Sequence, residues 1–65
     1  MEEIYLYRSA AAMIKQHGEN ASMEAALKSD AMLKKGDTKG AKVWRDVIKR
    51  IDILQARKPD NVTQH

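Results

Sequence analysis

Cysteine and phenylalanine are missing from this 65-residue chain, which also has one proline and only three aromatic residues in total. Without cysteine, neither disulfide bonds nor thiolate–metal bonds can stabilise a fold. A domain this short buries only about 60% of the surface that its unfolded chain exposes, which leaves a stability of roughly a few kcal/mol. We therefore expect a single domain with a thin core, stabilised by amphipathic helices or by burial against a partner or a second copy.

Long hydrophobic runs are also missing. No apolar stretch approaches the roughly 18 residues that a membrane-spanning helix needs. The chain begins with Met1, Glu2 and Glu3, and its two glutamates are acidic where a secretory signal would be basic. The sequence thus predicts no membrane contact and a cytoplasmic location.

Charge is present in quantity but is unevenly distributed. Residues 1–30 hold three basic and five acidic side chains, whereas residues 31–58 hold nine basic and three acidic ones, within a net charge of +3. Such a split can mark a surface that binds nucleic acid or a membrane. It can equally guide two copies together, acidic end to basic end.

Helix-forming residues separated by glycines predict an all-α fold, a small three-helix domain. The expected helices cover about 2–17, 21–35 and 38–57. Gly18 and Gly36 end the first two, because glycine readily adopts the left-handed conformation that follows a helix. Asn20 is expected to cap the second helix with its side chain.

The link between the second and third helices is short, which predicts that the last two helices form an antiparallel hairpin with the first laid across it. Gly40 lies in the first turn of the third helix, where it costs up to about 1 kcal/mol relative to alanine. Close contact with the preceding helix would compensate. Residues 1–58 are expected to form the helical domain, and residues 59–65, beginning at Pro59, a disordered polar tail.

Each expected helix carries an apolar stripe that we assign to the core. In the first helix the stripe comprises Ile4, Tyr7, Ala11 and Ile14, with Leu6, Ala10 and Met13 beside it. In the second helix it comprises Met23, Ala26, Leu27 and Leu33. The third helix has the clearest stripe, which comprises Trp44, Val47, Ile48, Ile51 and Leu54. Val43 and Ile53 lie off that stripe, so each is either a tolerated surface residue or part of a face covered by a second copy.

His17 and Glu19 form the only local cluster with chemical potential, either as a base and its orienting group or as metal ligands. Neighbours across a helix-ending glycine rarely converge, and the other histidine, His65, lies in the expected tail. A basic residue in the last turn of a helix is explained by its interaction with the helix dipole. We therefore expect no catalytic residue, no metal site and no cofactor, and we do not expect an enzyme.

The third helix also carries a basic face, which comprises Lys39, Lys42, Arg45 and Lys49. These side chains can contact phosphates and give salt-dependent binding to nucleic acid. Two features argue against that function. Asp46 lies four residues from both Lys42 and Arg50 and can pair with either. The N-terminal end of the helix lacks the Asn, Gln or Arg that typically reads bases.

The leading hypothesis is a non-enzymatic protein–protein interaction module, possibly homo-oligomeric, and a small nucleic-acid-associated regulator is the alternative. The residues expected to bind a protein partner or a second copy are Val43, Trp44, Val47, Ile51, Ile53 and Leu54. Trp44 has two interpretations, since it can anchor the core or, if exposed, dominate an interface.

Two resemblances to known families add context. From Gly36 to Leu54 the chain resembles the turn and second helix of a tetratricopeptide-type repeat, with Gly36-Asp37, Ala41 and the aromatic Trp44. That aromatic follows the alanine by three residues instead of four, and one repeat cannot stand alone. The resemblance implies a helical hairpin.

A longer stretch of the chain resembles a group of short, uncharacterised helical proteins of alphaproteobacteria. The residues that carry this resemblance are Ile14-Lys15-Gln16-His17-Gly18-Glu19, Ala25-Ala26, Asp30-Ala31, Leu33, Gly36-Asp37, Gly40, Trp44 and Ile48. It implies a bacterial, cytoplasmic protein and no particular activity.

Overall fold

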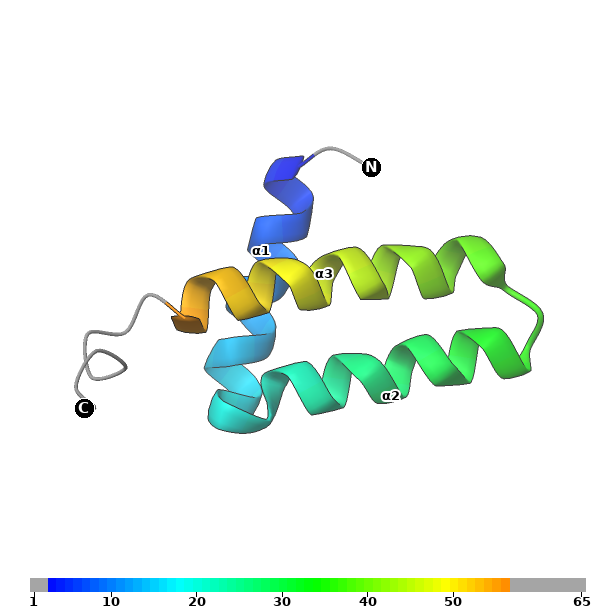
Figure 1. Ribbon diagram of the computed structural model, residues 1–65, viewed down its shortest axis with the longest axis horizontal. Coiled ribbons are helices and arrows are strands. Elements are labelled where there is room, and N and C mark those ends of the chain that lie inside the picture. The colour runs from blue at the N-terminus through cyan, green and yellow to red at the C-terminus, as the bar shows by residue number, and fades with distance from the viewer. Residues whose placement is uncertain (1–2, 57–65) are drawn as a thin grey trace.

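The computed structural model describes residues 3–56, and all of these except residues 35–37 have helical backbone (Figure 1). The elements are α1 (Glu3–His17), the 3-10 turn η1 (Gly18–Asn20), α2 (Ala21–Lys34) and α3 (Thr38–Ala56). The predicted all-α compact domain is confirmed. The predicted tail 59–65 and the outer limits of the domain at 1–58 lie outside the described residues.

The expectation of three separate helices is corrected by the structure. Helical backbone continues from residue 3 to residue 34 and again from 38 to 56, so the described residues form two helical runs packed together. Gly18 does not stop the first run. With φ at +58° it redirects the chain, and the 3-10 turn carries it directly into α2. The first run is thus bent into α1 and α2 without a loop between them.

Asn20 does not cap α2 with its side chain, contrary to the sequence-based expectation. Its φ and ψ of −91° and 6° lie outside the extended region that capping residues adopt. The 3-10 turn supplies an acceptor in its place, since the amide of Ala21 donates to the carbonyl of Gly18. That carbonyl also accepts a 2.9 Å hydrogen bond from Nε2 of Gln55, which ties the end of α3 to the bend.

The prediction that Gly36 ends α2 is confirmed, and its geometry is that of a Schellman motif. The amide of Asp37 donates to the carbonyl of Met32 at 2.8 Å, and the amide of Gly36 donates to the carbonyl of Leu33 at 2.9 Å. Gly36 has a φ of +82°, which disfavours any side chain. The local hydrogen bonds and the backbone conformation of Gly36 therefore determine the turn between α2 and α3.

Asp37 starts α3 by capping it, because its Oδ1 accepts a 2.8 Å hydrogen bond from the amide of Gly40. This cap explains the glycine. A Cβ at Gly40 would lie 2.7 Å from Oδ2 of Asp37. The cost of glycine in the helix at position 40 is thus offset by the space that it leaves for the capping carboxylate. The sequence had instead suggested that close contact with the preceding helix offsets this cost.

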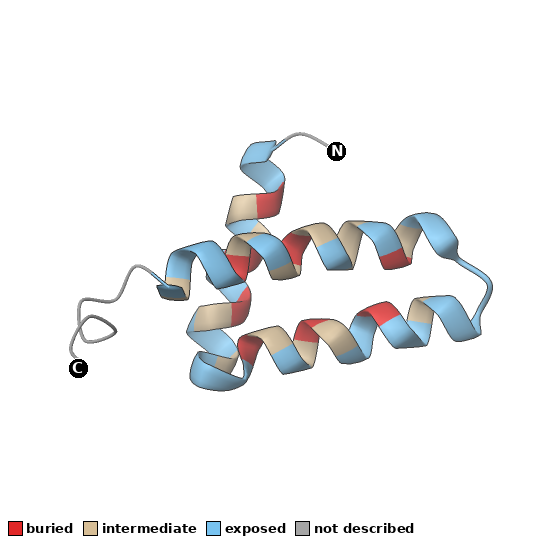
Figure 2. Cartoon of the chain, in the orientation of Figure 1, coloured by how far each residue is buried: buried red, intermediate tan, exposed pale blue. Residues whose placement is uncertain are grey.

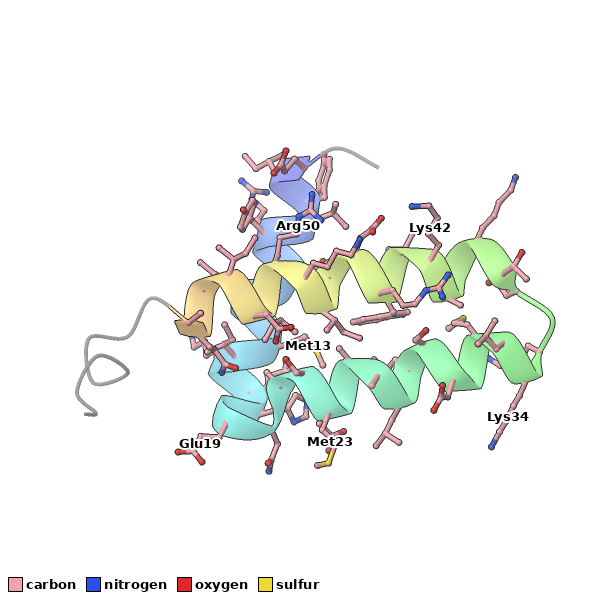
Figure 3. All side chains as sticks on the ribbon, in the orientation of Figure 1. Met13, Glu19, Met23, Lys34, Lys42 and Arg50 are labelled. Carbon is pink, nitrogen blue, oxygen red and sulfur yellow. The ribbon has the colours of Figure 1, made fainter. Side chains whose placement is uncertain are left out.

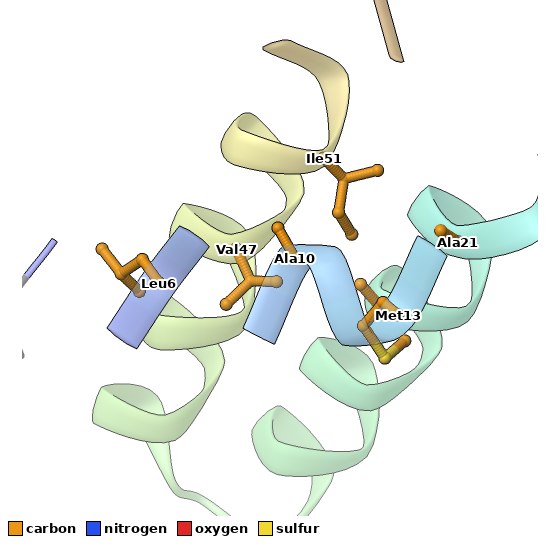
Figure 4. Close-up of a cluster of buried hydrophobic side chains, with 7 residues drawn as sticks. Leu6, Ala10, Met13, Ala21, Val47 and Ile51 are labelled. Carbon is orange, nitrogen blue, oxygen red and sulfur yellow. The ribbon is translucent and has the colours of Figure 1, made fainter. Parts of the chain in front are cut away.

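α2 and α3 run side by side in opposite directions, and α1 crosses behind them near the N-terminus of α2 and the C-terminus of α3 (Figure 1). The core lies where the three meet, as the buried positions show (Figure 2). It consists of Leu6, Ala10, Met13, Ala21, Ala25, Val47 and Ile51, with Ile14, Val43, Trp44 and Ile48 packed against it (Figure 4). The described part measures 43 × 22 × 19 Å.

The predicted core stripe of α2 is wrong except at Ala26, which is half-buried. Met23, Leu27 and Leu33 are exposed, and the buried positions are the small residues Ala21, Ala25 and Ser29. Their spacing of four residues places them on one side of the helix. Small side chains let α2 approach α3, whose larger residues fill the space between the two helices. Ser29 fits this seam by donating from Oγ to the carbonyl of Ala41 at 3.2 Å.

The stripe in α1 is displaced by a smaller amount. Leu6, Ala10 and Met13, expected beside the stripe, are its buried residues, whereas Ile4 and Ala11 are exposed. The reason is that α3 covers the side of α1 that carries Leu6 and Ala10. No helix within residues 3–56 is long and apolar enough to cross a membrane.

Candidate interaction surfaces

The predicted partner-binding residues do not form one surface. Val47 and Ile51 are 1% and 0% exposed and belong to the chain's own core, so in this conformation they cannot contact a partner. Their assignment as contact residues is corrected. The physical reason is that α1 and α2 both pack against this apolar stripe of α3, so the chain itself covers the residues that were predicted to contact a partner.

Trp44 and Val43 are half-buried and pack against the core. The indole ring of Trp44 is also covered by Lys28 of α2, whose Nζ lies 5.6 Å from the ring centroid. A cation over a partly exposed indole contributes about 0.5–1 kcal/mol. Of the two interpretations of Trp44, the core anchor agrees with this packing.

Ile53 and Leu54 are exposed near the end of α3. Ile53 lies on the side opposite Ile51, because two residues correspond to 200° around a helix. Leu54 lies at the edge of the buried stripe. These two side chains are the part of the predicted surface that the structure leaves accessible.

A second partly apolar surface lies on α2 and includes Met23 and Leu27, which the sequence analysis assigned to the core. We call it the α2 outer face. It consists of the exposed residues Met23, Leu27, Asp30, Ala31 and Lys34. Met23 and Leu27 each keep 56% of their surface exposed. Figure 3 shows Met23 and Lys34 projecting from the side of α2 that faces away from α3. The sequence feature that could have revealed this exposed face is the stripe of small residues on the opposite side of α2, which comprises Ala21, Ala25 and Ser29.

The predicted basic face of α3 is accessible, since Lys39, Lys42, Arg45 and Lys49 are all exposed. Figure 3 places Lys42 on the side of α3 that faces away from α2. Its Nζ lies 3.4 Å from Oδ2 of Asp46, so this carboxylate offsets part of the positive charge. The other three cations form no ion pair with residues 3–56.

Arg50, considered from the sequence only as a partner of Asp46, instead connects α3 to α1. Its guanidinium lies 5.8 Å from the ring centroid of Tyr7 and 3.6 Å from the carboxylate of Glu3. It also donates to the backbone carbonyl of Asp46 at 3.3 Å. Its Nε is buried without a partner among the described residues. The side chain of Arg50 is 20% exposed, so it contributes packing contacts in addition to its ion pair.

His17 and Glu19 are not brought together into a site. His17 is half-buried at the end of α1, whereas Glu19 projects outward from the turn in Figure 3. Within the described part of the chain no hydrogen bond joins them, and no group of three or more metal-binding side chains occurs there. Residues 3–56 likewise enclose no pocket.

Comparisons of the chain with known protein families, with curated proteins and with solved structures found no match. They neither support nor contradict the two resemblances that the sequence suggested. The function of the chain is therefore inferred from its surfaces.

Proposed function

We propose that this chain is a non-enzymatic protein–protein interaction module of the cytoplasm. The observation that carries the proposal is an imbalance in apolar burial within residues 3–56. Seven large apolar side chains remain 36–57% exposed, whereas only Leu6, Met13, Val47 and Ile51 are both large and buried. Of these seven, Met23 and Leu27 are neighbours one turn apart on α2, and contiguous exposed apolar side chains typically mark an interface.

The arrangement of the helices accounts for this imbalance. α1 covers only one end of the α2–α3 hairpin, and α2 uses small residues for its internal contacts. Met23, Leu27 and Leu33 of α2 are therefore left exposed. A reducing compartment suits a chain without cysteine, which supports the cytoplasmic part of the proposal.

A photo-crosslinking experiment tests the proposal. A benzophenone amino acid replaces Leu27, Ile53 or, as a matched exposed control, Lys15 of α1, and the chain is irradiated in the cells that produce it. We expect discrete protein adducts at Leu27 or Ile53 that an excess of the unlabelled chain abolishes, and none at Lys15. Adducts that are equal at all three positions, or absent from all three, contradict the proposal.

A second candidate function is binding to nucleic acid, favoured by the exposed cations Lys39, Arg45 and Lys49 that lack ion-pair partners within residues 3–56. Three or four phosphate contacts predict a loss of roughly 40- to 150-fold in affinity between 50 and 200 mM salt. Fluorescence anisotropy with labelled DNA and RNA measures this slope. Replacement of Lys42, Arg45 and Lys49 by glutamine provides the control, which should lose binding and keep its helicity.

A further inference from the structure

The α2 outer face combines exposed apolar side chains with a regular position on the fold. Met23 and Leu27 are one helical turn apart and lie opposite the buried seam of Ala21, Ala25 and Ser29. Since the seam already joins α2 to α3, no other helix within residues 3–56 covers this face. It is straight, and α2 spans 14 residues, or about 21 Å.

Charges of opposite sign lie at the two ends of α2, and Asp30 of the α2 outer face lies between Leu27 and Lys34. Glu19 lies just before α2 and Lys34 lies in its last turn, followed by Lys35 (Figure 3). Leu27 lies within one residue of the midpoint between Glu19 and Lys34. An identical face rotated by 180° would therefore place acid against base at both ends and leucine against leucine in the centre.

We propose that a second copy of this chain covers the α2 outer face, with the two α2 helices antiparallel and a two-fold axis near Leu27. This inference rests on the proposed function and names its partner. In this arrangement Met23 packs against the small Ala31 of the second copy, and Lys34 meets Glu19. A two-fold interface uses the same residues on both chains, so this one face is sufficient.

The antiparallel direction follows from the charges. A parallel pair would set Lys34 against Lys34 and Glu19 against Glu19, which is unfavourable. The antiparallel pair also opposes the two helix dipoles. A different protein could also present an apolar helix, but the opposite charges at the two ends of α2 and the leucine between them favour a second copy. Asp30, the other charged residue of the face, lies one turn before Lys34 and supplies no complementary charge.

The dimer should be weak and reversible. A single pair of helices about 21 Å long buries less area than the roughly 1,600 Å² of a standard interface. Association should therefore depend on concentration in the micromolar range and above. Measurements must span that range.

Sedimentation equilibrium of the full chain, the Leu27→Lys variant and the Ile53→Lys variant tests the proposal. Both replaced side chains are exposed, so circular dichroism should be unchanged in each. We expect L27K to weaken dimerisation at least tenfold, since two lysines would meet at the axis, and I53K to change it less than twofold. Equal effects would overturn the α2 surface and leave the proposed function standing. A wild-type chain that stays monomeric up to about 1 mM, equivalent to a binding free energy weaker than about −4 kcal/mol, would overturn self-association.

Disulfide trapping tests the direction, because the chain has no native cysteine. Under mild oxidation, Leu27→Cys should form a covalent dimer and Ile53→Cys should not, since a disulfide needs Cα atoms within about 7 Å. In a mixture of Glu19→Cys and Lys34→Cys chains, the mixed dimer should prevail. Prevalence of the two homodimers would overturn the antiparallel arrangement.

Discussion

At the scale of single residues, two glycines serve different purposes in the turn between α2 and α3. Gly36 supplies a backbone conformation with φ of +82°, which side chains rarely adopt. Gly40 has an ordinary helical conformation and instead supplies space, since an added Cβ would meet the carboxylate of Asp37. The two positions should therefore respond differently when their neighbours change.

The coupling between Gly40 and Asp37 gives a first prediction. In an Asp37→Ala background, Gly40→Ala should stabilise the protein by about 1 kcal/mol, because alanine is the better helix former. In the wild-type background the new methyl group displaces the cap, which is worth about 1 kcal/mol, and most of that gain should be lost. Urea denaturation of the four proteins measures the coupling. Additive effects would show that the carboxylate tolerates the methyl group.

The sequence predicted the position of this turn but not the reason for Gly40. Gly36 and Asp37 have local signatures, namely a glycine after the last helical turn and an acidic residue before the next helix. The space that Gly40 provides depends on the rotamer of Asp37, which no pattern of residue types specifies. For Gly18 the conformation was predictable, whereas the continuation of the helical backbone beyond it was not.

At the scale of the helices, α2 makes its internal contacts with its smallest side chains. Ala25 is fully buried, whereas Leu27, two residues further along, is 56% exposed. The helix is therefore sensitive to added volume on the seam and insensitive to lost volume on the outer face.

Substitutions on the two sides of α2 should differ accordingly. Ala25→Leu should destabilise the domain by about 1–3 kcal/mol, because it forces α2 away from α3. Leu27→Ala should change the free energy of unfolding by less than about 0.5 kcal/mol in dilute solution. Thermal or urea denaturation followed by circular dichroism measures both. A large loss for Leu27→Ala at low concentration would mean that its side chain supports the monomer.

Hydrophobic periodicity misassigned this helix because it weights large side chains. Met23, Leu27 and Leu33 are more hydrophobic than alanine and serine in any stripe, yet Ala21 and Ala25 are the core residues of α2, and the larger Trp44 and Ile48 of α3 pack against that core. Size complementarity between two helices is a property of the pair. In α3 the buried residues include large ones, and hydrophobic periodicity correctly predicted that Val47 and Ile51 lie in the core. The further prediction that these two residues contact a partner does not agree with their burial.

At the scale of the whole molecule, stability depends on very few side chains. Ile51 and Val47 are the largest fully buried ones within residues 3–56. Ile51→Ala should cost about 2–5 kcal/mol, which is comparable to the entire stability of a domain this short. The variant should be largely unfolded at 25 °C by circular dichroism. Ile53→Ala, on the same helix but 46% exposed, should keep its fold, and equal loss in both would contradict the described core.

The position of α1 across one end of the hairpin has a consequence for local opening. Beyond α1, the buried positions of the hairpin within residues 3–56 are the small residues Ser29 and Ala41, which share one hydrogen bond. Local opening there breaks few apolar contacts, so its free energy should be well below that of global unfolding. Amide hydrogens near residues 31–40 should exchange with deuterium faster than those near Val47 and Ile51, and equal protection of the two regions would contradict this. The hairpin would thus open from its turn while its crossed end stays closed.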